Sequence, residues 1–459
     1  MVIGLAGCVA LHRAPQERPV SPGPPAAWTH ADRWPVSATA AADEAWWSGF
    51  GDPLLARLVN ESMQANVGVL GAQAALRQAR ALRSVAAGAL QPRVDGSGSA
   101  SRSRQGGANA GNLFQVGLDA SWEIDVFGAR RAAVDTAEAA AGVGVATLGE
   151  LRVSIAAEVG LAYIALRGSQ TRLAVGEDNL RSQAETAQLT TWRAQAGLLS
   201  ALEAEQARAA SAQTAAALPP LRATVALQAH ALAVLTGRPA DGLDTLLADA
   251  RPVPWPGAAL ALRLPADTLR QRPDVRAAEQ QVLAAQGRVG QADAARYPGF
   301  RLGGSLGLSA LTLAALRGSG ALTSSLLAGI AWPAWDGGAA RAQVAAQQAA
   351  LDQARWTYRG TVLTALKEVE DALVALQGDL ARLERLTEAA GAATLAATYA
   401  RQRHLSGLVD FQTVLETQRT QLAAQDARAA STAEVASDHV RLFKALGGGW
   451  RATELPFLS

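Results

Sequence analysis

The sequence contains little that would support enzyme chemistry. Its 459 residues include a single cysteine, Cys8, which excludes intramolecular disulfides and cysteine-based zinc sites. The five histidines are scattered without metal-ligand spacing, and no P-loop or dinucleotide fingerprint is present. One G-x-S-x-G match, Gly303 to Gly307, falls inside an alternating strand pattern and not at a strand-to-helix elbow. We therefore expect no catalytic residue, no metal and no cofactor.

Net charge, aromatic residues and long apolar runs are scarce as well. The 42 basic and 40 acidic residues leave a net charge of +2, and no basic block is interleaved with aromatic residues, so nucleic-acid binding is not expected. Aromatic residues make up 5% of the chain, which favours long helices over a compact mixed core. No stretch approaches 18 consecutive apolar residues, so no transmembrane helix is predicted.

An internal repeat organises the chain. Residues recur at an offset of 210 positions, which becomes 206 further upstream. The pairs at 210 include Trp122 and Trp332, Gly128 and Gly338, Glu158 and Glu368, Arg193 and Arg403, Gly197 and Gly407, and Gly237 and Gly447. The sequence thus predicts two copies of one unit, residues 46–240 and 266–450, with a Pro-rich linker at 241–265 and a tail at 451–459.

Each copy predicts a helix, two strands and then more than a hundred residues of helical sequence. The four strands are expected at about 93–104, 113–126, 299–310 and 323–334. In the last three, apolar residues alternate with small or polar ones, whereas 93–104 is small and polar. In the clearest strand, one face carries Phe114, Val116, Leu118, Ala120, Trp122, Ile124 and Val126. Strands of this length are long enough to cross a bilayer when tilted.

The helical segments carry a heptad pattern. Apolar residues step by three and four at Leu366, Val369, Leu373, Leu376, Leu380 and Leu383, and less purely in the first copy from Ala156 to Leu173. This pattern predicts helices that pack along one another as coiled coil. Residues 129–197 contain no proline and could form a helix of roughly 100 Å. Turns are expected at Gly197 and Gly407, and Pro219-Pro220 should interrupt the return helix of the first copy.

Four strands with one apolar face predict an oligomer. Open sheet edges in lipid leave backbone groups unpaired, so the sheet must close into a barrel. Single-chain barrels start at eight strands, whereas three chains of four strands would give twelve. The predicted fold is mainly α, with a small transmembrane β-barrel that several chains of four strands each close, and a long coiled-coil α-helical barrel. The choice of a trimer, with twelve strands, rests partly on the family resemblance that follows.

Five motifs resemble those of TolC-type outer membrane factors, specifically the lipoprotein branch that serves RND efflux pumps. They are Trp46-Trp47-x-x-Phe50-x-Asp52-Pro53, Leu118-x-Ala120-x-Trp122-Glu123-Ile124-Asp125-x-Phe127-Gly128, Arg270-x-Arg272-Pro273-Asp274-Val275-Arg276, Trp335-Asp336-Gly337-Gly338 and Ala445-Leu446-Gly447-Gly448-Gly449-Trp450. The resemblance implies a homotrimer in the outer membrane that extends into the periplasm. It would be a passive conduit for small molecules, with a periplasmic membrane-fusion adaptor protein and an inner-membrane RND transporter as partners.

The residues around Cys8 resemble a bacterial lipobox. Leu5-Ala6-Gly7-Cys8 fits the pattern at which a signal peptidase cuts before an acylated cysteine. We expect residues 1–7 to be the remnant of a signal peptide and residues 8–45 to be a lipid-anchored, Pro-rich tether. Because residues 1–7 lack a basic segment, we also expect the natural start to lie upstream.

The resemblance further implies two sites near the helix turns. Glu416 and Arg419 correspond to charges that close the periplasmic gate, whereas the first copy has Gln206 and Ala209 there. The alternative is an ordinary surface ion pair at i,i+3.

The matching turns are the expected docking tips for the adaptor, although they could simply be two helix turns. The docking residues are Arg193, Gly197, Leu198, Arg403, Gly407 and Leu408. The heptads alone would also suit a soluble or peripheral coiled-coil periplasmic scaffold or adaptor without a pore.

Overall fold

The computed structural model describes residues 25–30, 45–104, 106, 110–257 and 265–450. Cys8, the predicted signal-peptide remnant 1–7, most of the tether and the tail at 451–459 lie outside these residues. Their predicted roles are not tested by the structure.

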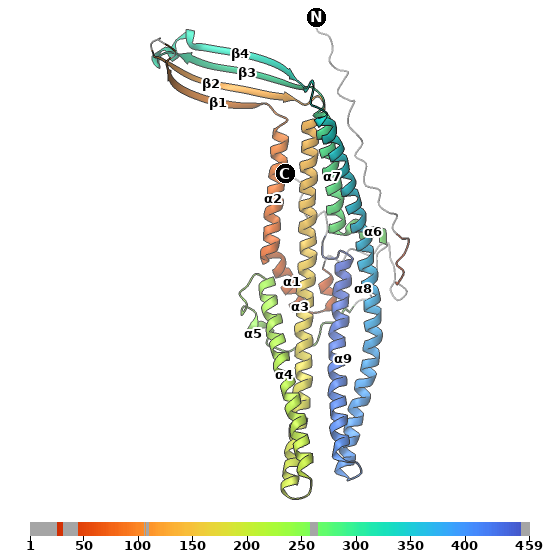
Figure 1. Ribbon diagram of the computed structural model, residues 1–459. Coiled ribbons are helices and arrows are strands. Elements are labelled where there is room, and N and C mark those ends of the chain that lie inside the picture. Colours follow the sequence, from red (N-terminus) through yellow and green to blue (C-terminus); the bar gives the residue numbers. More distant parts are fainter. Residues whose placement is uncertain (1–24, 31–44, 105, 107–109, 258–264, 451–459) are drawn as a thin grey trace. The chain divides into compact units, whose positions relative to one another are not determined.

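The two sequence copies fold into the same succession of elements with the same helix lengths. Their first helices, α2 (Val67–Gly88) and α7 (Pro273–Ala294), have 22 residues each. The long helices α3 (Ala129–Gln195) and α8 (Ala339–Leu405) have 67 residues each, and the return helices α4 (Ala201–Leu235) and α9 (Phe411–Ala445) have 35. The internal repeat is therefore structural as well as sequential (Figure 1).

Shorter elements lie outside this repeated succession. The described chain opens with the 3₁₀ turn η1 (Trp46–Phe50) and helix α1 (Pro53–Ala65). Helix α5 (Asp244–Leu247) lies between the copies, and helix α6 (Pro265–Gln271) opens the second copy. Two further 3₁₀ turns, η2 (Ala314–Arg317) and η3 (Ser319–Ala321), fall in the connection of the second hairpin.

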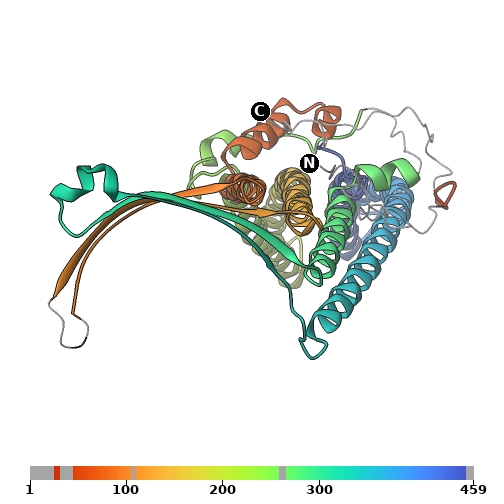
Figure 2. The ribbon, with the colours of Figure 1, turned by 90° about the horizontal axis from the view of Figure 1, so that it is seen from above.

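The described residues form two compact units, and each unit is considered separately. The first contains residues 74–146 and 274–361, apart from the undescribed positions 105 and 107–109. Its four-stranded antiparallel sheet has the order β1 (Arg93–Ser103), β2 (Gly111–Ile124), β3 (Gly299–Ala310) and β4 (Leu322–Ala331). The strands lie side by side and curve together (Figure 2).

The pairing of β2 with β3 joins the hairpins of the two copies into one sheet. This pairing runs from Phe114 opposite Ala310 to Ile124 opposite Phe300. Among the described strands, β1 and β4 each pair on one side only. Apolar side chains of the two central strands, including Val116, Leu118 and Leu306, remain exposed in the single chain.

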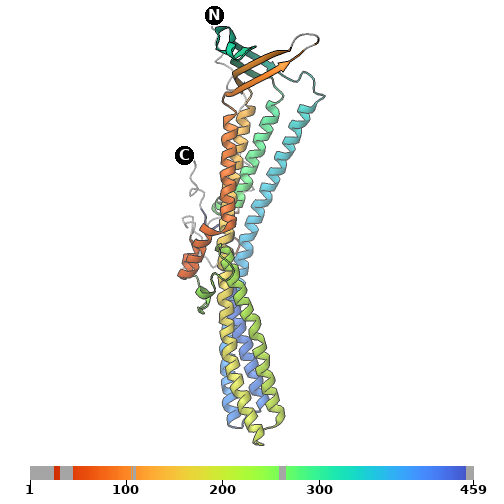
Figure 3. The same ribbon diagram turned by 90° about the vertical axis from the view of Figure 1, so that its left-hand side faces the viewer.

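The second unit contains residues 147–273 and 362–450, together with two N-terminal segments and apart from positions 258–264. In it, α4 runs back along α3 and α9 runs back along α8 (Figures 1 and 3). The heptad residues Val369, Leu373 and Leu376 are fully buried, and they form one core with Trp28, Val435 and Leu442. The coiled-coil pattern of the sequence thus corresponds to the α8–α9 contact.

The Trp-rich motifs at the two ends of the second unit pack on α3. The Trp46 ring stacks on Phe443, with centroids 5.4 Å apart. Trp450 is buried against Gly149, where an added Cβ would lie 2.5 Å from the indole ring. Asp52 caps α1 by accepting from the backbone N–H of Leu54 at 2.8 Å. These contacts give the tryptophan and glycine motifs a structural role.

The predicted break at Pro219-Pro220 is wrong, because α4 continues through both prolines to Leu235. Proline removes a helical hydrogen bond, so tertiary packing must offset its cost. The adjacent Leu218 is buried against Gly176 of α3, where an added Cβ would lie 2.6 Å from the leucine side chain. This close helix–helix contact holds α4 in register.

Helix α3 is long and apolar enough in one segment to cross a membrane by length and composition alone. The sequence analysis had predicted no such helix. The match is weak evidence for a membrane span, because buried core helices of soluble proteins pass the same test.

We predict that Gly149→Ala destabilises the protein by about 1–3 kcal/mol, because its methyl group would overlap the Trp450 ring. Gly378→Ala in α8 is the matched control, since no atom lies within 4 Å of its added Cβ and alanine favours helix. Chemical denaturation of the two variants measures the difference. Equal losses of stability would contradict the proposed role of Gly149.

Candidate functional site

The turns that join the paired helices have the same geometry in both copies. Gly197 and Gly407 have φ values of +74° and +72°, a left-handed conformation that glycine adopts without steric cost. The backbone N–H of Leu198 donates to the carbonyl of Arg193 at 2.8 Å, and Leu408 donates to Arg403 at 2.9 Å. The repeated Arg-x-x-x-Gly-Leu spacing is therefore that of a hydrogen-bonded helix C-terminus.

The helix after each turn begins with a side-chain cap. Ser200 and Glu203 form a capping box at the start of α4. Asp410 accepts from the backbone N–H of Thr413 at 2.9 Å at the start of α9. Hydrogen bonds from the Thr413 side chain and backbone lower the pKa of Asp410. Both ends of each turn are thus fixed by hydrogen bonds.

The fixed turns present apolar side chains to solvent. Leu198 is 73% exposed and Leu408 is 72% exposed. Exposed leucines at matching places on two ordered turns form a repeated apolar contact point.

A groove of about 390 Å³ lies beside the turns, between α3 and the α8–α9 pair. Its lining combines apolar side chains with charged ones, and consists of Glu185, Thr186, Gln188, Leu189, Thr190, Trp192, Arg193, Arg401, His404, Leu405, Phe411 and Val414. Among the six predicted docking residues, only Arg193 lines it. Trp192, which is 58% exposed in the last turns of α3, is absent from the docking residues predicted from the sequence. An exposed tryptophan near a helix end was the available signal.

Glu416 and Arg419 lie on the exposed side of α9. The other side of this turn of helix is packed, because Leu415 and Gln418 are buried. In the part of the chain that the structure describes, no ion pair joins Glu416 to Arg419 or to another residue. The alternative of an i,i+3 surface pair is therefore not observed within the single chain.

Polar contacts connect α9 to α3 behind these two charges. Arg172 donates to both carboxylate oxygens of Asp426, at 2.7 and 2.9 Å, and Asn179 donates to Gln425 at 2.9 Å. A cavity of about 240 Å³ beside them has a polar lining that includes Asp178, Gln183, Gln418 and Gln421. This part of the α3–α9 contact is a polar seam and lacks a continuous apolar core.

Comparison with known proteins places the chain in a family. The family model described as outer membrane efflux protein matches residues 58–238 and 264–448. The chain belongs to the outer membrane efflux protein family.

Relatives within this family cover nearly the whole chain. The pyoverdine export outer membrane protein OpmQ of Pseudomonas putida is 31% identical over 443 residues, covering 94% of this chain and 93% of the relative. The toluene efflux pump outer membrane protein TtgI of the same species is 29% identical, with coverage of 88% and 87%. The predicted resemblance to TolC-type outer membrane factors is thus confirmed.

Solved structures of outer-membrane channels have the same fold. The outer-membrane channel OprN superposes with a TM-score of 0.87 at 34% identity, over 95% of this chain and 99% of that chain. The Campylobacter jejuni channel CmeC gives a TM-score of 0.85 at 23% identity, a likeness of fold. The predicted fold class and outer-membrane location are confirmed, and this efflux-family chain is an outer-membrane channel protein. Relatives of this kind point to a non-enzyme.

We predict that Asp410→Ala loosens the second turn of this family member, because α9 loses its N-terminal acceptor. Asp410→Asn is the control, since its amide oxygen can still accept from Thr413. Hydrogen exchange of the backbone amides around residues 405–415 should speed up in the alanine variant only. Unchanged exchange in that variant would exclude a capping role.

Proposed function

We propose that three copies of this chain form a passive channel of a tripartite, RND-type efflux pump, through which small molecules leave the periplasmic side of the outer membrane. The observation that carries the proposal is the four-stranded sheet, whose outer strands β1 and β4 each leave one edge unpaired among the described strands. In lipid those edges require partners. Three sheets joined edge to edge would supply them in a twelve-stranded barrel.

The exposed apolar side chains of the sheet support a lipid contact. Val116, Leu118 and Leu306 have no cover within the single chain. Apolar residues on the outer face of a transmembrane barrel face acyl chains. Outer-membrane lipid is therefore a partner in this proposal, and acylation of Cys8 would add a lipid anchor.

The helix turns are the proposed contact with a periplasmic adaptor protein. Two matching turns per chain each present an exposed leucine, and an apolar groove with a charged rim lies beside them. An amphipathic helix hairpin of the adaptor has the chemistry to occupy such a groove. The adaptor would link the channel to an inner-membrane transporter, which supplies the energy and selects the transported compound.

The charged gate is the remaining part of the proposal. Glu416 and Arg419 are exposed on α9 and have no partner within the described chain. Three carboxylates and three guanidiniums near a common axis could bridge between chains and narrow the pore. The polar α3–α9 seam supports movement of α9, since its hydrogen bonds can be exchanged for bonds to water.

We predict that Glu416→Ala/Arg419→Ala raises the single-channel conductance in planar bilayers, because the bridging charges are lost. The matched control is Glu205→Ala/Arg208→Ala, which removes an i,i+3 ion pair of 2.8 Å on the α4 surface of the first copy. The control should conduct like the wild type. Equal conductance of all three proteins would remove the gate from the proposal and leave the pore.

We predict that Leu198→Asp/Leu408→Asp abolishes export in cells while the channel still assembles, because the adaptor contact loses both apolar points. Gln213→Asp, at an exposed position of α4 away from the turns, is the control for an added negative charge. Resistance to a toxic small molecule, in a channel-deficient strain that carries the variant, measures export. The amount of oligomer in outer-membrane fractions measures assembly. Full resistance with the double variant would exclude the turns as docking points.

A further inference from the structure

A buried carboxylate with an unsatisfied oxygen lies in the α8–α9 contact of the second unit. Asp438 of α9 is 2% exposed, and its Oδ1 accepts from Arg441 at 2.6 Å. Its Oδ2 is shielded from solvent and has no hydrogen-bond partner among the described residues. The fully buried Val435 and Leu442 lie about one turn away on either side. An ionised oxygen without a donor in such surroundings is strongly disfavoured.

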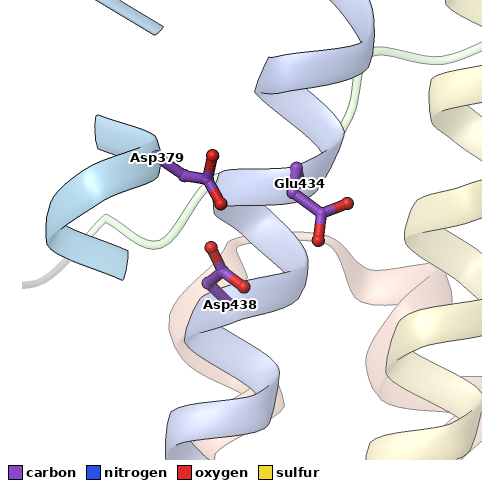
Figure 4. Close-up of side chains that lie close together, drawn as sticks. All are labelled: Asp379, Glu434 and Asp438. Atoms are coloured by element: carbon purple, nitrogen blue, oxygen red, sulfur yellow. The ribbon is translucent and has the colours of Figure 1, made fainter. Parts of the chain in front are cut away.

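A second carboxylate faces Asp438 from the neighbouring helix. Asp379 of α8 lies close to Asp438, with Glu434 of α9 beside them (Figure 4). One oxygen of each of the three carboxylates lies within 4.8 Å of the others. The Asp379–Asp438 contact therefore brings two acceptors together without a donor between them. Two like charges at this separation raise the affinity of the pair for a positive charge.

The nearby cations satisfy only part of this cluster. Arg441 donates to Glu434 at 2.6 Å as well as to Asp438. Arg382 of α8 lies 3.7 Å from Asp379. The N-terminal segment that packs on the same core through Trp28 places His30 2.9 Å from Glu370, which precedes Asp379 in α8 and lies outside the cluster. Glu434 and one oxygen of Asp438 thus have a guanidinium, and the second oxygen of Asp438 does not.

One proton completes the hydrogen bonding without moving a side chain. Three carboxylates could also hold a divalent cation, which prefers oxygen ligands. However, the Arg441 guanidinium already contacts two of the three, and its positive charge would repel a metal ion bound beside it. A proton needs only the space between two carboxylate oxygens, as in other paired acids.

We propose that Asp379 and Asp438 share one proton, and that this proton stabilises the contact between α8 and α9 at mildly acidic pH. We call this shared proton the clasp. Burial raises the pKa of Asp438 to about 6. The hydrogen bond from Arg441 opposes this rise, and the neighbouring Asp379 adds to it. The folded protein therefore binds this proton more tightly than the unfolded chain, whose aspartates titrate near pH 4. The stabilisation is complete below about pH 4 and is lost as the pH rises through about 6.

The clasp would act on the helix pair that also carries Glu416. Its position is about 40 Å along the helices from the Gly407 turn, by the rise of an α-helix. The inference does not depend on the proposed gate, since it concerns only the contact between α8 and α9.

Thermal unfolding of the full-length, detergent-extracted protein at pH 5 and pH 8 tests the clasp. The comparison is between wild type, Asp438→Asn, which mimics the protonated acid, and Glu434→Gln, a control that removes a carboxylate already paired with Arg441. At pH 8 we expect Asp438→Asn to melt a few degrees above wild type. Its melting temperature should change less than that of wild type between the two pH values, whereas Glu434→Gln should keep the wild-type pH dependence. His30, Glu370 and the buried His439, whose pKa burial lowers, are common to all three proteins.

A direct signal and a second variant make the test decisive. Infrared difference spectra should contain a protonated carboxyl band at pH 5 that Asp438→Asn lacks. If Asp438→Asn fails to fold, Asp379→Asn replaces it and should show the same reduced change of melting temperature with pH. An identical pH dependence of the melting temperature in wild type, Asp438→Asn and Asp379→Asn would overturn the proposal. Stabilisation of the wild type by millimolar Ca²⁺ or Mg²⁺ at pH 8, absent in Asp438→Asn, would overturn it in favour of a cation site.

Discussion

The unpaired backbone groups at the two edges of the sheet constrain the rest of the molecule. Strands β1 and β4 each pair with one neighbour in the described chain, and apolar side chains of β2 and β3 are exposed. In water the exposed leucines are unfavourable, and in lipid the unpaired edges are unfavourable. Only an assembly that joins edges and faces lipid satisfies both requirements. The trimer that we propose satisfies this constraint, and the family resemblance favours three chains over two.

The internal repeat fits such an assembly. The two copies have helices of equal length, and their turns have the same left-handed glycine and the same hydrogen bond. Three chains with two equivalent hairpins each would present six nearly identical turns to a partner. The copies differ where function is proposed to differ, since Glu416 and Arg419 of the second copy correspond to Gln206 and Ala209 of the first. The two copies thus share a structure, and only the second carries the charges of the proposed gate.

Local sequence patterns predicted the regular elements well. Alternation located the four strands, and the heptad steps identified Val369, Leu373 and Leu376 as core residues, because both signals are periodic along one element. Pro219-Pro220 gave a wrong prediction, because the packing of Leu218 against Gly176 depends on a neighbouring helix. Local propensity does not contain that contact.

Contacts between distant segments were not predictable from the sequence. The groove beside Trp192 and the Asp379–Asp438 pair both depend on the register between helices. The fit of Trp450 against Gly149 joins residues that no local pattern connects. The roles of Cys8, Glu416 and Arg419 came from the family resemblance and stay predictions.

The number of chains in the extracted protein tests the central claim most directly. Native mass spectrometry of the detergent-solubilised protein measures that number without assuming a function. We predict a species of three chains, because three sheets of four strands pair every edge in a closed barrel. A stable, folded monomer would leave the edges of β1 and β4 open, and a dimer would close only eight strands. Either result would contradict the account.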